Sequence, residues 1–198
     1  MLTKKFDEAL LFASDLHREQ TRKSTDIPYL GHLLSVAGLV LENDGDEIQA
    51  ISALLHDAIE DQAEVFGPAD ALGDEIEKRF GLEVRQIVEA CSDSTGGPKG
   101  EWEPRKLAYI AQIQQKSSRI ALVSVADKVH NARSIVADLR RIGVEVFDRF
   151  TGGREGTIWY YSELSRTFNE FHPSFLATEL ERLVVDMNDL VRKITEAQ

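Results

Sequence analysis

Residues 46–61 read DEIQAISALLHDAIED, and this stretch decides how the rest of the chain is interpreted. Its apolar residues recur every three or four positions, which is typical of a helix rather than a strand. Asp46 is a suitable N-cap, and the apolar run ends in the dipeptide His56-Asp57. Because an imidazole and a carboxylate are costly to bury without partners, this end of the helix is a candidate for chemistry.

The same spacing continues along the chain and predicts an all-α protein of about eight to ten helices. We expect one domain over residues 1–198, in which residues 169–198 contribute a C-terminal helix. The expected helices cover about 3–20, 32–41, a segment from the Asp46 cap into 56–61, 69–80, 82–93, 103–116, 118–139, 155–169 and 174–195.

Composition excludes several classes of function. The chain has 34 acidic and 23 basic residues and a net charge of −11, which disfavours long nucleic acid as a partner. No apolar run approaches the roughly 18 residues that a membrane span needs. The single cysteine, Cys91, cannot form an internal disulfide, which fits a reducing cytoplasm and excludes a cysteine-based zinc site.

Four side chains on three expected helices form a candidate metal-binding set: His32, His56, Asp57 and Asp127. Two nitrogens and two carboxylates suit a divalent ion such as Mn²⁺, Fe²⁺ or Zn²⁺. The residue types alone leave a second interpretation open, in which His56-Asp57 is a hydrogen-bonded pair in the core or an ordinary polar helix end.

Two further carboxylates follow the His-Asp pair. Glu60 and Asp61 lie four residues beyond His56 and Asp57, so one continuous helix would place them on the same face. Carboxylates so close repel one another unless a cation lies among them or a proton is shared. This spacing therefore favours a cation at the site.

Three segments resemble, in order, the motifs of the RelA/SpoT-type hydrolase domain in the HD phosphohydrolase superfamily. They are residues 13–32, which contain ASDLHREQTRK and PYLGH, residues 53–61, ALLHDAIED, and residues 126–133, ADKVHNAR. The resemblance covers about residues 3–168 and implies a single HD domain with an all-α fold. It also implies a stand-alone small alarmone hydrolase, similar to the metazoan members, without an attached synthetase or regulatory domain.

The resemblance implies a role for each motif residue. One divalent ion, with Mn²⁺ preferred and Fe²⁺ or Zn²⁺ as alternatives, would be held by His32, His56, Asp57 and Asp127. Glu60 and Asp61 would be the catalytic acidic pair that positions or deprotonates the attacking water.

The substrate contacts implied are Arg22, Lys23, Tyr29, Lys99, Asn131 and Tyr160. Lys106 competes with Lys99 for the phosphate-binding role, because the loop before it departs from the family pattern. Four of these residues also have a plainer interpretation: Arg22 and Lys23 as a solvated basic pair, and Tyr29 and Tyr160 as packed aromatics.

The implied reaction is hydrolysis of the 3′-pyrophosphate of ppGpp, which yields GDP and pyrophosphate. A metal-dependent phosphatase of NADPH or of a nucleoside monophosphate is one alternative, and a nucleotide-binding regulatory module without turnover is another. The partner in every case is a small phosphorylated nucleotide, and no membrane is involved. The apolar stripe of the last helix packs either internally or against a second copy in a homo-oligomer.

Overall fold

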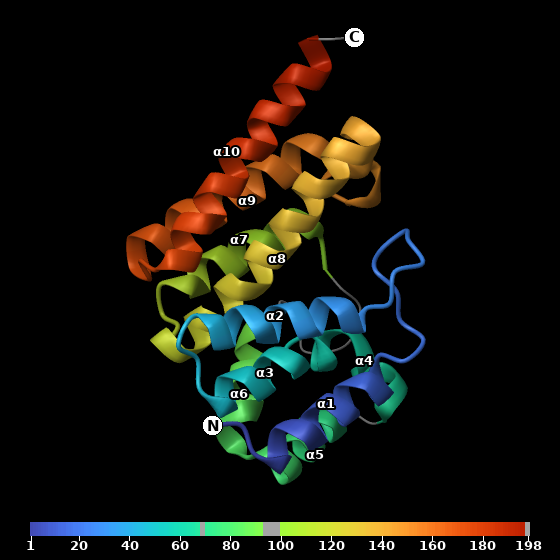
Figure 1. The fold of residues 1–198 in the computed structure, drawn as a ribbon, viewed down its shortest axis with the longest axis vertical. Helices are drawn as coiled ribbons and strands as arrows, with labels where there is room; N and C mark the ends of the chain where they lie inside the picture. The colour runs from blue at the N-terminus through green and yellow to red at the C-terminus, as the bar shows by residue number, and fades with distance from the viewer. Residues whose placement is uncertain (68–69, 93–99, 197–198) are drawn as a thin grey trace. The chain divides into compact units, whose positions relative to one another are not determined.

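The computed structural model describes residues 1–67, 70–92 and 100–196, and this part of the chain is helical (Figure 1). It contains ten α-helices, one 3-10 helix and, among the described residues, no β-strand, so the all-α prediction is confirmed. The elements are α1 (Lys4–Leu16), α2 (Leu30–Glu42), α3 (Glu47–Leu55), α4 (Ala58–Phe66), α5 (Ala71–Phe80), α6 (Leu82–Cys91), α7 (Trp102–Ile113), α8 (Ser118–Ile142), η1 (Gly143–Arg149), α9 (Gly153–Phe171) and α10 (Phe175–Glu196).

One expected helix is two helices in the structure. The apolar pattern predicts a single helix that runs past the His-Asp pair, but α3 ends at Leu55 and α4 begins at Ala58. The Nδ1 atom of His56 lies 2.8 Å from the carbonyl oxygen of Ala53. In a continuing α-helix that oxygen would accept from the N–H of Asp57, so the imidazole competes with the next helical turn. The prediction that Glu60 and Asp61 share one continuous helix with His56 is therefore wrong.

The sequence pattern also did not predict η1. Gly143 has a positive φ of +71°, a conformation that residues with a side chain rarely adopt, and it directly follows α8. The chain leaves the α-helix there and continues as a short 3-10 turn that buries Val146 and Phe147.

The chain divides into two compact units, and the boundary falls inside α8. Unit 1 contains Met1–Gly100 and Lys116–Ala126, and unit 2 contains Glu101–Gln115 and Asp127–Gln198. Unit 1 therefore holds α1 to α6 and the first part of α8, whereas unit 2 holds α7, the remainder of α8, η1, α9 and α10.

Helix α3 is the centre of unit 1. It packs against α1, α2 and α6, and all its residues from Gln49 to Leu55 are buried; Figure 1 shows it beside α2. The small residues Ala50, Ser52 and Ala53 let neighbouring helices approach, while Ile51 and Leu54 fill the core between them. A helix buried on every side carries the residues at its C-terminal end into the interior as well.

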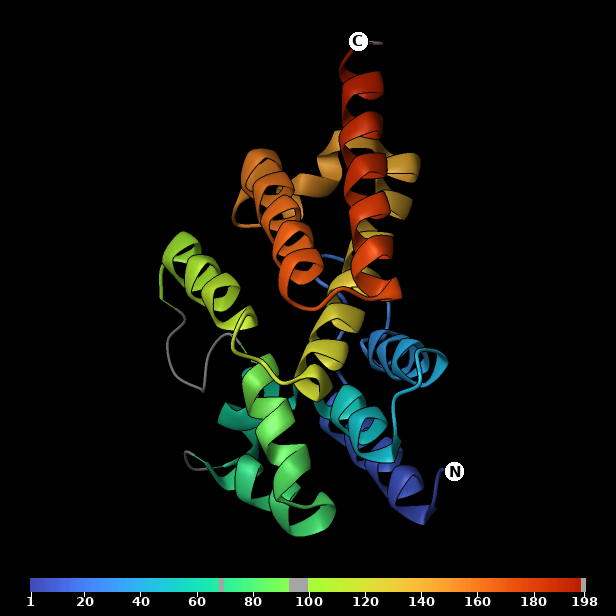
Figure 2. The same ribbon diagram turned by 90° about the vertical axis from the view of Figure 1, so that its left-hand side faces the viewer.

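Unit 2 is built on the pair α9 and α10, which lie side by side (Figure 2). Helix α10 also contacts η1, and α7 packs on α9. In the apolar stripe of α10, Leu176, Leu180 and Met187 are at most 1% exposed within the single chain and pack internally. Leu190 and Val191 of the same stripe are half-buried. Of the helices described, none has the length and apolar character needed to cross a membrane.

Asp46 caps α3 as the sequence predicts. Its carboxylate accepts from the N–H of Gln49 at 3.0 Å, the Gln49 side chain accepts from the N–H of Asp46 at 3.2 Å, and Arg119 pairs with Asp46 at 2.7 Å. Partial burial opposes ionisation, but the Gln49 hydrogen bond and Arg119 outweigh it and lower the pKa of the Asp46 carboxyl.

We expect Asp46→Ala to lower the free energy of unfolding by about 1–2 kcal/mol, measured by urea denaturation at pH 7. Asp46→Asn keeps the cap and loses only the ion pair, so its loss should be smaller. Because the folded pKa is depressed, the difference between parent and alanine variant is complete above about pH 4 and shrinks as the pH falls through the folded pKa. Equal stability of all three proteins would contradict this account of the cap.

Candidate metal centre and active site

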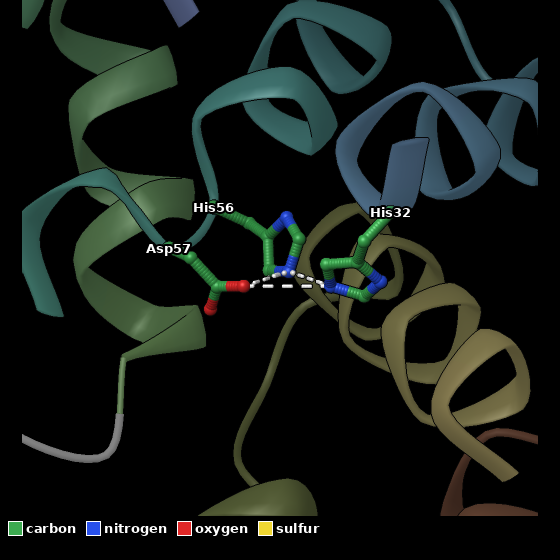
Figure 3. A group of neighbouring side chains, drawn as sticks. All are labelled: His32, His56 and Asp57. Atoms are coloured by element: carbon green, nitrogen blue, oxygen red, sulfur yellow. Dashed lines mark hydrogen bonds and ion pairs between the residues drawn. The ribbon is translucent and has the colours of Figure 1, made fainter. Parts of the chain in front are cut away.

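Three side chains of unit 1 converge on one point (Figure 3). His32 comes from α2, and His56 and Asp57 come from the junction between α3 and α4. The Nε2 atoms of His32 and His56 are 3.3 Å apart, and Oδ2 of Asp57 lies 3.4 Å from the first and 2.9 Å from the second. Both imidazoles are buried, each only 2% exposed. The structure brings these three residues together, and their role as metal ligands stays a prediction.

These distances fit a shared metal ion. Nitrogen and oxygen ligands lie about 2.1 Å from a first-row divalent ion. Two such ligands of one ion are therefore about 3.0 Å apart at a right angle and about 3.4 Å apart at a tetrahedral angle. The three observed separations, 2.9, 3.3 and 3.4 Å, lie at or near this range. The residues present can hold a divalent ion.

The tautomer of His56 also suits this role. Its Nδ1 atom lies 2.8 Å from the Ala53 carbonyl oxygen, which can only accept, so Nδ1 carries the proton. The Nε2 atom then presents a lone pair toward His32 and Asp57. A backbone carbonyl that fixes the ring in this way is the usual outer partner of a metal-binding histidine.

Tyr29 contacts two residues of the cluster, Asp57 and His32. Its hydroxyl donates to Oδ2 of Asp57 at 2.5 Å, and its ring packs edge-on against His32 with centroids 5.3 Å apart. Sequence reasoning assigned Tyr29 to the nucleotide pocket and missed this contact, because the partner lies 28 residues away along the chain. Its contact with substrate stays a prediction.

The loop before α2 presents the two basic residues that the sequence singled out. The guanidinium of Arg22 lies 5.5 Å from the ring centroid of Tyr29, close enough for a cation–π contact. Lys23 is exposed on the same loop. The N–H of Arg22 donates to the carbonyl of Ile27 at 2.8 Å, which closes the loop next to the Thr21–Pro28 bridge.

Glu60 and Asp61 lie in the first turn of α4, where the helix dipole favours negative side chains. Both are half-buried, and the backbone N–H of Asp61 donates to the carbonyl of Asp57 at 2.9 Å. The carboxylate Oδ2 of Asp61 accepts from Nε2 of Gln20 at 2.8 Å. The sequence analysis gives Gln20 no role, although the residue lies within the motif of residues 13–32.

His17 is a buried, hydrogen-bonded histidine. Its Nδ1 atom lies 2.6 Å from Oε1 of Gln20, and its ring stacks on Tyr29 with centroids 5.5 Å apart. Burial lowers the pKa of the His17 imidazole, and this effect outweighs the opposite influence of Gln20 and of the Asp57 and Asp61 carboxylates. Burial therefore favours the neutral form of this ring.

Asp127, the fourth expected ligand, belongs to unit 2, and the contacts given below join it to residues of that unit. Its Oδ2 pairs with Nζ of Lys128 at 2.7 Å, and its Oδ1 accepts from Nδ2 of Asn131 at 2.5 Å. Burial alone would lower the pKa of the Lys128 ammonium, but the Asp127 carboxylate outweighs burial and raises it well above its usual value. Sequence reasoning gave Asn131 to the substrate and missed Lys128; in the structure both hold the Asp127 carboxylate.

The two remaining residues expected to contact substrate are Tyr160 and Lys99. Tyr160 is buried in unit 2, where Trp102 packs edge-on against it and Nζ of Lys106 lies 5.0 Å from its ring centroid. Lys99 lies outside the described residues. A substrate role for either residue stays a prediction.

Comparison with known proteins assigns this chain to a family. The family model described as "HD domain" matches residues 9–158, about three quarters of the chain, and this range includes residues of both units. The chain belongs to the HD domain family. The resemblance that the three sequence motifs carry is thereby confirmed.

Individual proteins and one solved structure are also similar to this chain. The guanosine-3′,5′-bis(diphosphate) 3′-pyrophosphohydrolase MESH1 of Mus musculus is 37% identical over 131 residues, which cover 65% of this chain and 68% of that protein. The MESH1 protein of Drosophila melanogaster is 34% identical over 134 residues, 66% of this chain and 69% of that protein. A solved structure reported as a metazoan ortholog of SpoT that hydrolyzes ppGpp superposes with a TM-score of 0.73 at 25% identity. It covers 92% of this chain and 95% of its own.

Removal of the Tyr29 hydroxyl tests the ligand cluster. We expect Tyr29→Phe to weaken Mn²⁺ binding about 10-fold, measured by isothermal titration calorimetry, because the hydroxyl orients the Asp57 carboxylate. Asp57→Asn, which removes the charged ligand, should abolish measurable binding.

An exposed aspartate of the same unit provides the control. Asp15→Asn should bind Mn²⁺ as the parent does, because Asp15 pairs only with the exposed Arg18 among the contacts described. Unchanged Mn²⁺ affinity in Asp57→Asn would refute the site.

Proposed function

We propose that this chain hydrolyses the 3′-pyrophosphate of ppGpp, a guanosine bis(diphosphate), and releases GDP and pyrophosphate. The observation that carries the proposal is the convergence of His32, His56 and Asp57 in a chain homologous to named ppGpp pyrophosphohydrolases. In the balanced reaction, the oxygen of a water bonds to the phosphorus on the 3′ oxygen. The bond between that phosphorus and the 3′ oxygen breaks, and a proton ends on the 3′ hydroxyl.

We propose manganese as the ion, as the sequence resemblance implies. Fe²⁺ and Zn²⁺ are the alternatives, because two imidazoles and carboxylates suit all three ions. His32, His56 and Asp57 would hold it, and Asp127 is proposed as the fourth ligand on the sequence resemblance alone. When bound, such an ion supplies Lewis acidity toward a phosphoryl oxygen and makes a water more acidic. Lys128 and Asn131, which both contact Asp127, would keep its carboxylate in a fixed orientation.

Glu60 and Asp61 are proposed as the acidic pair that orients the attacking water and accepts its proton. Both carboxylates lie in the first turn of α4, three and four residues after the proposed ligand Asp57, so a short helical segment connects them to the metal site.

The cationic side chains proposed for substrate binding are Arg22, Lys23 and Lys99. Positive charge must balance the charge on the transferred phosphoryl group. Tyr29, Asn131 and Tyr160 are proposed to line the nucleotide site. A small polyphosphate responds to the field of its own cleft, so the net charge of −11 does not oppose its binding.

We further propose one HD domain over residues 1–198 and a reducing, cytoplasmic setting. The single cysteine, Cys91, is a buried free thiol, which supports that setting.

The function is tested with purified protein, Mn²⁺ and ppGpp, with the products separated by anion-exchange chromatography. We expect GDP and pyrophosphate in equal amounts, and we expect Asp57→Ala to lower the rate at least about 1000-fold. Asp15→Ala, an exposed aspartate variant, should match the parent. Orthophosphate as the product, or metal-dependent nucleotide binding without any product, would refute the proposal.

The role of Asp61 has its own test. Asp61→Asn should lower kcat about 100- to 10000-fold, the usual contribution of a positioned general base. Because Asp61 is not a proposed ligand, its Mn²⁺ affinity in calorimetry should stay within about threefold of the parent. A loss of metal affinity as large as that of Asp57→Asn would show that Asp61 belongs to the ligand set instead.

A further inference from the structure

Gln20 is a half-buried residue that the proposed mechanism leaves without a role. Its Nε2 atom donates to Oδ2 of Asp61 at 2.8 Å. Its Oε1 atom lies 2.6 Å from Nδ1 of His17 and 2.6 Å from Nε2 of Gln62. One amide thus bonds to the proposed base on one side and to two nitrogen atoms on the other.

The charge of Asp61 determines which way this amide points. In the opposite orientation, Oε1 of Gln20 would face the Asp61 carboxylate, and two acceptors would meet without a proton between them. With Oε1 facing His17, the Nδ1 atom of that ring carries the proton. Burial of His17, which is 2% exposed, favours the neutral form of this ring. The order His17, Gln20, Asp61 is therefore a directed chain of hydrogen bonds.

The same segment also contacts the metal ligand. The backbone N–H of Tyr29 donates to the carbonyl of Gln20 at 2.9 Å. The Tyr29 ring stacks on His17, and its hydroxyl donates to Asp57. The segment of residues 17–29 therefore contacts two carboxylates that are four positions apart along the chain. Tyr29 bonds to Asp57, and Gln20 bonds to Asp61.

We infer that Gln20 is a positioning residue, which fixes the Asp61 carboxylate relative to the metal ligand Asp57. An uncharged N–H restricts rotation of the carboxylate without neutralising it, so Asp61 keeps its capacity to accept a proton. An error of about 1 Å in the position of such a group can cost about 100-fold in rate. The inference rests on the proposed function, because the role of Asp61 belongs to it.

Gln20→Met tests the inference, since methionine has nearly the same length and shape but no N–H. We expect kcat for ppGpp to fall about 10- to 100-fold. KM and Mn²⁺ affinity should change less than about threefold, because the proposed ligands and substrate contacts remain. A merely structural role would not separate kcat from these two quantities.

Gln49→Met is the matched control. Gln49 is a buried glutamine of the same unit whose side chain bonds to Asp46 and to the carbonyl of Arg119, outside the site. This variant should lose thermal stability but keep the parent kcat well below its unfolding temperature. Equal losses of kcat in both variants, or an unchanged kcat in Gln20→Met, would overturn the inference.

A second readout does not depend on turnover. In nuclear magnetic resonance spectra, the side-chain amide protons of Gln20 should shift when Asp61 becomes Asn and stay in place when Asp15 becomes Asn. Absence of that shift would overturn the inference whatever the activity. Failure of the parent to hydrolyse ppGpp would instead refute the proposed function, and the amide shift would still decide whether Gln20 holds Asp61.

Discussion

The site depends on one hydrogen bond, from Nδ1 of His56 to the carbonyl oxygen of Ala53. Helix α3 is buried on every side, so an imidazole at its end has no water to bond. The ring bonds to its own helix instead, α3 stops there, and Nε2 turns toward His32 and Asp57. The same break makes Asp57 the first residue before α4, so a core-packing constraint places both a nitrogen and a carboxylate at one point.

The loop of residues 17–29 adds further contacts to this arrangement. It brings no metal ligand, but its side chains hold the two carboxylates of the α3–α4 junction and of the first turn of α4. Its hydrogen bonds and ring contacts are short-range and directional, unlike the apolar packing around α3. A site that needs carboxylates at fixed positions gains rigidity from such support, because packing alone does not fix the rotation of a carboxylate.

Much of this could be predicted from sequence, because periodic apolar spacing and the Asp46 cap are local signals. The α3–α4 break could not be predicted, since the three-four spacing of apolar residues continues through Ala58 and Ile59 and conceals it. The positions of His32, His56 and Asp57 followed from motifs. The partner of Gln20, by contrast, lies 41 residues away, and only the packing of α1, α2 and α4 brings the two together. Lys128 escaped notice for a related reason, because a lysine is ordinarily exposed and its burial beside Asp127 is a property of the folded chain.

The proposed roles of the other residues all follow from direct binding of one divalent ion by His32, His56 and Asp57. X-ray diffraction from crystals grown with Mn²⁺, recorded on both sides of the manganese absorption edge, tests it without reference to turnover. We expect a single anomalous peak about 2.1 Å from both histidine Nε2 atoms and from Oδ2 of Asp57. A peak elsewhere, coordination through Nδ1 of His56, or no peak at saturating Mn²⁺ would contradict it.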